Sequence, residues 1–508
     1  MQDRRAHLGV ADTGVGGWTP AVPLALGLGA LLALRLLGLA FNATDLFFDE
    51  AQYWSWGREP AFGYYSKPPL IAWIIGLTTG LCGDSTACVR LPAPILHTAT
   101  AVLVYLIGRR LHGATVGVLS ALAFATLPGI SFSSGIISTD VPLLACWALA
   151  LWGLIALAQG DSPYPAVALG LGLGLGLNAK YAMVFFIVCL GVWMAVTPTA
   201  RRLLKDARLW VGLGIGGLLI VPNLVWNLGH GFATFAHTAD NAKLGGALIN
   251  AGKGLEFVAA QFGVFGPILF AALLAVIWRA WRDGLPEGDR LLLSFTLPVL
   301  LLITGQAFLS RAHANWAAVS YVAGVVLVTA TLVRLGSERW LHRSLALHAV
   351  LAVVLVVATG FAGRFALPGI GDPFQRTLGW RELAGEVRVA LTEARFAGQP
   401  FRAVITDDRA VTAELLYYLR EDPTPVLAWH SGGRPRDHYE MTRPFRDPSA
   451  VPILLVSVRR DPSPIARRFS SVVALGERTV PAGSGEPRSL RLFSLSGYSV
   501  DGSIVRTR

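Results

Sequence analysis

The stretch Leu46-Phe47-Phe48-Asp49-Glu50-Ala51-Gln52-Tyr53-Trp54 decides how this chain is read, together with Tyr64-Tyr65-Ser66-Lys67-Pro68-Pro69 shortly after it. The two segments hold adjacent carboxylates, a cluster of aromatic side chains and a lysine. They lie between the first long apolar segment and the next one. We therefore interpret the rest of the chain as a scaffold that holds this loop at a membrane surface.

The composition is that of a polytopic membrane protein. Of the 508 residues, 53% are hydrophobic and 15% are charged, and the mean hydropathy is +0.53. Soluble proteins carry about a quarter charged residues. The net charge of +11 does not indicate a nucleic-acid partner, because Lys and Arg accumulate in the cytoplasmic loops of membrane proteins.

Eleven apolar segments are long enough to be predicted as membrane spans, each needing roughly 20 residues. Several are rich in glycine, which suits close helix packing in lipid. The predicted spans are 21–41, 89–108, 113–130, 140–158, 164–179, 181–197, 209–226, 256–278, 291–309, 315–333 and 344–366. The first of them has no small-residue cleavage site near its end, so we interpret it as a retained helix rather than a signal peptide.

The distribution of Lys and Arg predicts the orientation. With residues 1–20 as a cytoplasmic N-terminus, four of the five inside connections are basic, as the positive-inside rule requires. The loop 42–88 then lies outside, which in a bacterium is the periplasmic face of the inner membrane. Within it, residues 69–81 are apolar but too short to span, and we expect an interfacial helix there.

Residues 367–508 have the composition of a soluble domain, placed on the same outer side by eleven spans. The pattern predicts a small α/β domain with helices at 380–395 and 411–420. Predicted strands are 402–406, 424–429, 451–458, 471–475 and 490–495. Asp407 and Asp408 follow the first strand, where they could bind a ligand or simply favour a helix N-terminus.

The cysteines separate into two pairs. Cys146 and Cys189 sit in apolar runs and are predicted to be inert packing residues. Cys82 and Cys88 lie close together in the outer loop, where an oxidising compartment would allow a disulfide; two free thiols are the alternative. The cysteine and histidine spacings predict no metal site.

Several polar side chains at outer loop ends are candidates for chemistry. A carboxylate at the membrane boundary is costly to desolvate, so its presence there suggests a function. Asp49 and Glu50 are therefore either a catalytic pair or, if the loop is polar, a solvated pair. Tyr53 and Tyr64 could stack on a sugar ring or belong to an interfacial aromatic belt. Lys67, held extended before two prolines, suits a phosphate ligand but could also be a snorkelling lysine.

The second candidate carboxylate is Asp140, in Ser138-Thr139-Asp140-Val141-Pro142. It could cap a helix, face a site, or do both. Lys180 lies at another outer turn, where it could meet a lipid phosphate or mark the interface. The remaining outer polar candidates are Trp226, His230, His237, Arg311, His313 and Asn315.

Jointly, five motifs of this chain resemble the GT-C membrane glycosyltransferases, over about residues 21–370. The closest resemblance is to the protein mannosyltransferase-like branch, which includes lipid A aminoarabinose and galacturonosyltransferases. The motifs are the Asp49-Glu50 pair, Tyr64 to Pro69, Val89-Arg90-Leu91-Pro92, Gly108-Arg109-Arg110-Leu111 and Thr139-Asp140. The implied fold is a polytopic all-α membrane domain of GT-C type, with about eleven transmembrane helices, interfacial helices in the first outer loop and the soluble C-terminal α/β domain.

The resemblance implies an inverting transferase that uses a polyprenyl-phosphate sugar. It implies Asp49 as the essential acid, Asp140 as the second acid, and Lys67 and Lys180 as ligands of the donor phosphate. We predict that Tyr65, close to Lys67 in sequence, also belongs to the donor-phosphate site. A Glu that helps to hold a metal in the aminoarabinose transferases is Ser66 here, so we predict no metal or other cofactor.

We expect the acceptor to be a lipid A-like glycolipid or a polysaccharide, and the enzyme to be a monomer among membrane lipids. The alternatives are a protein O-mannosyltransferase and, from a different class, a lipid or sugar transporter or flippase. Asp49 would act as a general base on an acceptor hydroxyl, or as an orienting group if the acceptor is a phosphate.

Overall fold

The computed structural model describes residues 21–160, 162–242, 250–369, 371–447, 451–459 and 461–498. The predicted cytoplasmic N-terminus, residues 1–20, lies outside the described residues. The chain divides into two compact units, each built from separate parts of the sequence. Among the described residues, the helical unit comprises those within 21–40, 67–71 and 90–356, and the mixed unit comprises those within 41–66, 72–89 and 357–498.

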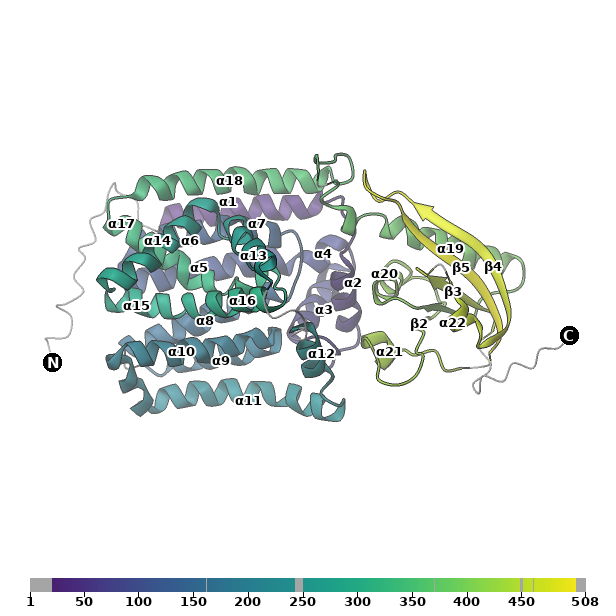
Figure 1. The fold of residues 1–508 in the computed structure, drawn as a ribbon, viewed down its shortest axis with the longest axis horizontal. Helices are drawn as coiled ribbons and strands as arrows, with labels where there is room; N and C mark the ends of the chain where they lie inside the picture. The colour runs from purple at the N-terminus through teal and green to yellow at the C-terminus, as the bar shows by residue number, and fades with distance from the viewer. Residues whose placement is uncertain are drawn as a thin grey trace. The chain divides into compact units, whose positions relative to one another are not determined.

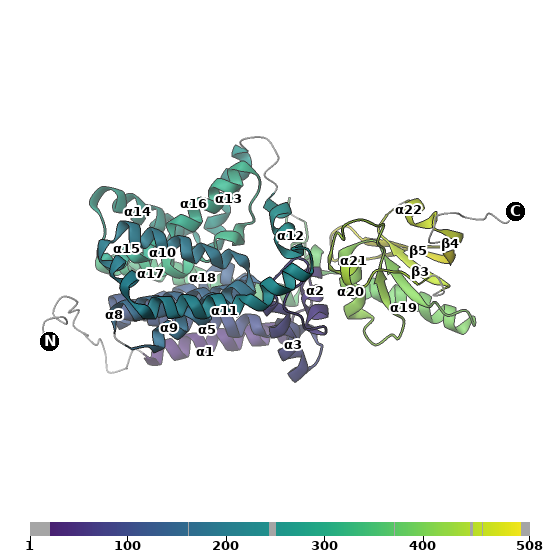
Figure 2. The same cartoon turned by 90° about the horizontal axis from the view of Figure 1, so that it is seen from below.

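Long apolar helices make up the helical unit, and they run alongside one another in both views (Figure 1; Figure 2). In chain order the helices of this unit, with the short helices that connect the long ones, are α1 (Ala21–Ala40), α5 (Pro92–His112), α6 (Ala114–Thr126), α7 (Pro128–Ser133), α8 (Asp140–Gln159), α9 (Tyr164–Ala179), η1 (Tyr181–Val184), α10 (Phe185–Val196), η2 (Pro198–Lys205), α11 (Ala207–Gly229), α12 (Ala233–Ala242), α13 (Ala251–Val264), α14 (Pro267–Asp283), α15 (Glu287–Ser294), α16 (Leu297–Leu309), η3 (Ala314–Ala317), α17 (Ser320–Arg334) and α18 (Glu338–Gly360). Their apolar sequences explain why they are helices in lipid, where every backbone group must be bonded within its own segment.

Glycine brings α9 against both of its neighbours. A Cβ added at Gly172 would lie 2.5 Å from the backbone nitrogen of Ala150 on α8. A Cβ at Gly170 would lie 2.7 Å from the carbonyl oxygen of Gly212 on α11. The Gly-rich run therefore acts as a packing surface, because small residues let membrane helices approach backbone to backbone.

Six described helices are long and apolar enough to cross a membrane, or eight if each of two bent helix pairs is one span. The chain is therefore a multi-pass membrane protein. The expected count of eleven is not confirmed, because several predicted segments form shorter or broken helices. The predicted span 256–278 breaks into α13 and α14, bent by 115°. Gly266 makes the break, with φ +87° and with His348 so close that a Cβ would lie 2.0 Å from its Nε2.

The mixed unit contains the helices of the first loop. They are α2 (Phe48–Gly57), α3 (Leu70–Cys82) and α4 (Thr86–Arg90). The first two residues of α3 and the last residue of α4 belong to the helical unit. The apolar stretch expected to be a short helix is α3. Cys82 and Cys88 are joined as a disulfide, and the indole nitrogen of Trp54 donates to Asp84 Oδ1 at 2.7 Å inside the loop that this disulfide closes.

A five-stranded sheet with the order β2-β1-β3-β5-β4 forms the rest of the mixed unit. Its strands are β1 (Ala403–Thr406), β2 (Val426–Ala428), β3 (Ile453–Ser457), β4 (Phe469–Val480) and β5 (Arg488–Tyr498). β2, β1 and β3 are parallel, whereas β5 and β4 are antiparallel and form the long curved pair of Figure 1. The helices are η4 (Gln375–Thr377), α19 (Trp380–Phe396), α20 (Arg409–Tyr418), α21 (His438–Thr442) and α22 (Ser463–Ala466).

The first loop, apart from residues 67–71, folds as part of this α/β unit. The sequence prediction grouped residues 42–88 with the membrane domain and began the soluble domain at residue 367. In the structure α2 packs against α20, with Trp54 edge-on to Tyr417 at 5.0 Å. Leu46, Ala51 and Trp56 of the loop are buried. The loop therefore gains its apolar core from residues that follow it by more than 300 positions.

Candidate functional site

The two adjacent carboxylates of helix α2 have different surroundings. Phe47 precedes the helix in an extended conformation, and both acids lie in the first turn, where the helix dipole favours negative charge. Glu50 is fully buried, and its Oε2 accepts from the backbone nitrogen of Phe47 at 2.8 Å. This is the reciprocal half of a capping box, so Glu50 stabilises the start of the helix. The Asp49 side chain is instead about one-third exposed (36%).

Arg409, the first residue of α20, contacts Asp49. Its Nη1 donates to Asp49 Oδ1 at 3.0 Å and to Gln52 Oε1 at 2.8 Å. The guanidinium also lies 4.9 Å from the centre of the Phe48 ring. Sequence analysis missed Arg409, although Asp407-Asp408-Arg409 at a strand end was a visible signal. Asp408 proves to be a helix cap, accepting from the backbone nitrogens of Ala410 and Val411.

The aromatic side chains of the loop are packed inside the mixed unit. Tyr64 stacks on Trp56 with ring centres 4.6 Å apart, and its hydroxyl donates to the Trp56 carbonyl at 2.9 Å. Burial raises the pKa of Tyr64 to about 12. Tyr53 is also buried and lies 5.3 Å from Trp56. These placements leave neither tyrosine ring open to stack on a sugar.

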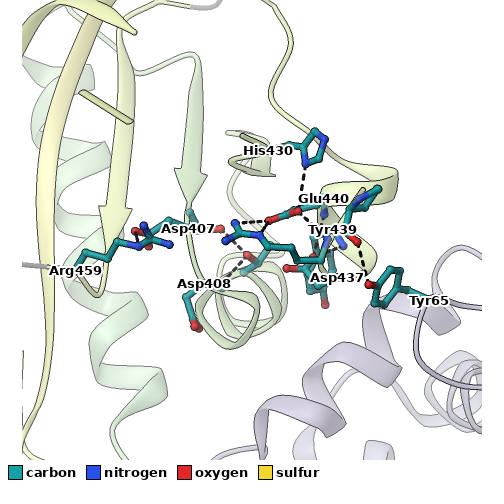
Figure 3. A network of polar contacts seen from close by, with 12 residues as sticks. Tyr65, Asp407, Asp408, His430, Asp437, Tyr439, Glu440 and Arg459 are labelled. Atoms are coloured by element: carbon teal, nitrogen blue, oxygen red, sulfur yellow. Dashed lines mark hydrogen bonds and ion pairs between the residues drawn. The ribbon is translucent and has the colours of Figure 1, made fainter. Parts of the chain in front are cut away.

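Polar contacts attach the same loop to the C-terminal residues. The Tyr65 hydroxyl donates to the carbonyl of Pro435 at 2.9 Å, and Figure 3 shows Tyr65 reaching the segment that begins α21. Ser55 Oγ and the Tyr439 hydroxyl are 2.9 Å apart. Tyr65, expected near a donor phosphate, is thus a buried contact between the loop and the α/β fold.

A second polar network lies next to this contact. Glu440 is buried, and its carboxylate accepts from Arg436 and His430, as Figure 3 shows for the histidine. Burial opposes its charge, but the hydrogen bonds from Arg436 and His430 outweigh burial and hold the pKa of Glu440 below its usual range. Asp407 pairs with Arg459, while burial raises the pKa of Asp407.

The residues around Asp49 do not fit a divalent cation. Ser66 supplies only a hydroxyl, 3.5 Å from Gln52 Nε2, and the side-chain oxygen Oε1 of Gln52 already accepts from Arg409. A guanidinium therefore stands where a cation would need the Asp49 and Gln52 oxygens. No group of three His, Cys, Asp or Glu side chains within the described ranges could hold a metal ion. Lys67, which follows Ser66, is half-buried and belongs to the helical unit.

In the helical unit, Asp140 and Lys180 form a pair between the starts of α8 and η1. Lys180 Nζ donates to Asp140 Oδ1 at 2.7 Å, and Asn315 Nδ2 donates to Asp140 Oδ2 at 2.5 Å. Both side chains of the ion pair are mostly buried. Asp140 therefore joins three segments far apart in the sequence. Its oxygens have these partners in place of the helix-cap bonds that were the simpler alternative.

The polar end of α11 is held by Tyr181. Its hydroxyl donates to Asn223 Oδ1 at 2.7 Å and accepts from Asn227 Nδ2 at 3.2 Å. Phe235 of α12 stacks on the Tyr181 ring with centres 4.7 Å apart. Lys180 directly precedes Tyr181 in the chain. Because the hydroxyl and the ring of Tyr181 are both held, the turn that carries Lys180 is fixed in place.

The remaining predicted residues lie at the ends of helices of the same unit. His230 is exposed, and its ring stacks on Trp226 with centres 4.0 Å apart. His313 lies edge-on to Trp316 at 5.3 Å, next to Asn315. His237 is half-buried on α12, and Arg311 is exposed after α16. Asn315, from the same stretch, is the residue that contacts the Asp140–Lys180 pair, through Asp140.

Comparisons with known proteins agree with this architecture. Residues 66–226 match the family model described as dolichyl-phosphate-mannose-protein mannosyltransferase. The lipid A galacturonosyltransferase RgtD of Rhizobium johnstonii is 37% identical over 407 residues, covering 80% of this chain and 84% of the relative.

Two crystal structures of ArnT from Cupriavidus metallidurans share the fold. The apo structure matches with a TM-score of 0.65 at 14% identity, covering 94% of this chain and 98% of that one. The structure bound to undecaprenyl phosphate matches with a TM-score of 0.61 at 13% identity, covering 93% and 97%. With the close relationship to the galacturonosyltransferase, they show that the chain belongs to the GT-C membrane glycosyltransferases.

Proposed function

We propose that this protein transfers a sugar from a polyprenyl-phosphate donor to a lipid A-type acceptor, at the periplasmic face of the bacterial inner membrane. The observation that carries the proposal is the 37% identity, over most of both chains, to a lipid A galacturonosyltransferase. The fold shared with ArnT, which was crystallised bound to undecaprenyl phosphate, supports a donor of that class. We take galacturonic acid as the sugar to test first.

The proposed reaction is an inverting displacement. An acceptor hydroxyl attacks the anomeric carbon, the bond from that carbon to the phosphate oxygen breaks, and the polyprenyl phosphate leaves. Asp49 takes the hydroxyl proton as general base, since its side chain is partly exposed and its Oδ2 has no hydrogen bond among the described residues. Glu50, which binds its own helix start, serves as a positioning residue.

The leaving phosphate needs positive charge more than it needs a proton. We assign Lys67 and Lys180 to this role, because fixed cations stabilise charge that develops in the transition state. Asp140 and Asn315 would hold Lys180 in place. We propose no metal. Trp226, His230, His237, Arg311 and His313 remain candidates for contacts with the sugar or the acceptor.

A second candidate is a protein O-mannosyltransferase, because the matching family model carries that description. Both candidates use a polyprenyl-phosphate donor, and the acceptor separates them. A transporter or flippase would move lipid without forming a glycosidic bond.

The test is transfer by the purified protein in lipid, with undecaprenyl-phosphate galacturonic acid as donor and lipid A as acceptor. We expect lipid A to gain one hexuronic acid residue by mass spectrometry. Asp49→Asn should lower the rate by about 10²–10⁴-fold, as for loss of a general base. Glu59→Gln, in the same loop and paired with Arg443, is the control and should keep the activity. Full activity of the Asp49 variant would refute the assigned role, and transfer only to protein acceptors would favour the second candidate.

A further inference from the structure

We propose that Arg409, supplied by the C-terminal α/β fold, is the positioning residue of Asp49, and that the catalytic loop is complete only when this fold is present. The inference rests on the proposed function, because it assigns the base role to Asp49. It concerns contacts made entirely within the mixed unit. Arg409 and Asp49 are 360 residues apart in sequence.

The guanidinium is placed to hold one face of α2. Asp49 and Gln52 are three residues apart, so their side chains lie on the same side of the helix. A single nitrogen, Nη1, donates to both, at 3.0 Å and 2.8 Å. Phe48, one residue earlier, offers its ring to the same guanidinium at 4.9 Å. Three neighbouring side chains thus share one cation.

The backbone of Arg409 is itself fixed. Asp408 caps α20, and the Thr412 hydroxyl donates back to the Asp408 carbonyl at 2.8 Å. Thr412 and Thr406 hydroxyls are 2.5 Å apart, which connects the first turn of the helix to strand β1. The arginine therefore starts from a rigid corner between strand and helix. Precise orientation of a catalytic group requires such support.

This placement divides the work between the two oxygens of Asp49. Oδ1 accepts from Arg409, whereas Oδ2 has no hydrogen bond or ion pair among the described residues. A carboxylate held through one oxygen presents the other in a fixed direction. Loss of Arg409 should therefore lower the rate of the chemical step and leave substrate affinity unchanged, because only the orientation of the base is lost.

The same loop carries a matched control. Arg443 pairs with Glu59, another contact between the first loop and the C-terminal fold. Like the Arg409 pair, it joins an arginine that is about one-third exposed to an acid of the loop. It does not touch Asp49. A general weakening of the contact between loop and fold would affect both pairs, whereas a positioning role concerns Arg409 alone.

The experiment measures kcat and KM for transfer from undecaprenyl-phosphate galacturonic acid to lipid A. Arg409→Ala should lower kcat by about 10–100-fold with KM unchanged, the cost of a small misplacement. Arg409→Lys should recover part of the loss, because it keeps the charge. Arg443→Ala should retain the wild-type kcat. In an Asp49→Asn background, Arg409→Ala should have no further effect, because the two residues act as a unit.

Three outcomes would overturn the inference. The first is a wild-type kcat for Arg409→Ala with KM also unchanged. The second is a wild-type kcat with a raised KM, which would make Arg409 a substrate ligand. The third is an equal loss of kcat for Arg443→Ala. If Arg409→Ala does not fold, Arg409→Gln, which retains most of the side chain, decides by the same criteria. Absence of transfer by the wild-type protein is a different result, since it refutes the proposed function itself.

Discussion

Replacing Asp140 by asparagine should destabilise the helical unit, because it leaves Lys180 without its charged partner. The ion pair is short, at 2.7 Å, and the two side chains are only 20% and 11% exposed for lysine and aspartate. The new amide side chain would still fill the same volume and could still contact Asn315. The substitution therefore removes charge with little change in packing.

The expected size follows from distance and burial. At 2.7 Å two unit charges attract by about 6 kcal/mol with an effective dielectric constant of ~20. Desolvation of both groups offsets much of this attraction, although removing one partner of a buried pair costs about 3–5 kcal/mol. Because some solvent reaches this pair, we expect a loss of about 2–4 kcal/mol for Asp140→Asn and for Lys180→Met. The double variant should lose less than the sum of the two, with a coupling of about 2 kcal/mol.

Two buried thiols allow unfolding of this unit to be followed separately. Cys146 on α8 and Cys189 on α10 are free and buried, whereas Cys82 and Cys88 are joined in a disulfide. A thiol reagent added along a denaturant series therefore reports opening of the helical unit. Lys253→Met changes an exposed lysine of the same unit and should shift the transition by no more than about 0.5 kcal/mol. Additive losses in the double variant would refute the reasoning, because they would show that the two charges do not stabilise each other.

Two further predictions concern packing and pH. Gly172→Ala should destabilise the helical unit by about 1–3 kcal/mol, because the new Cβ would meet the Ala150 backbone. Gly191→Ala is the control and should change stability little, because the space around Gly191 is open. Protection of the buried thiols measures both variants. Glu440→Gln should lower the melting temperature of the purified protein at neutral pH by removing the partner of Arg436, a loss of about 2 kcal/mol. Because the pKa of Glu440 is lower in the folded than in the unfolded protein, its ionised carboxylate stabilises the fold above the unfolded-state pKa. This stabilisation is lost as the pH falls through the folded-state pKa. The Glu440→Gln variant should therefore lose stability less steeply than the wild type below about pH 4.5. An unchanged acid limb would contradict that interpretation.

Local sequence patterns predicted most of the helices and strands. Apolar runs matched helices such as α1 and α8 to within a residue or two, because lipid leaves the backbone little choice but a helix. The same runs could not reveal that the segment 256–278 bends by 115°, since the bend depends on contact between Gly266 and His348. Cys82 and Cys88 lie close together in sequence, which allowed either a disulfide or two free thiols. The structure has the disulfide.

The candidate site was predictable as far as it lies in motifs. Asp49, Asp140 and Lys180 were proposed as site residues from motifs, whereas the partners of the two acids were not predicted, because Arg409 and Asn315 come from segments 360 and 175 residues away from the acids that they contact. The tyrosines show the opposite error. Their position between apolar segments fits a sugar platform or an interfacial belt, whereas in the structure they form the core beneath the loop.

The membership of the first loop in the α/β fold changes how the C-terminal residues should be understood. A domain appended to a membrane enzyme could be removed with the catalytic loop intact. Here the loop's own buried residues pack on α20, Tyr418 donates through its hydroxyl to Asp45, and the backbone nitrogen of Leu46 donates to the same hydroxyl. Removing residues 367–508 would expose that core and release Asp49 together. The α/β fold is therefore part of the structure that holds the loop carrying Asp49, the proposed base, and Arg409 is one of the residues through which it does so.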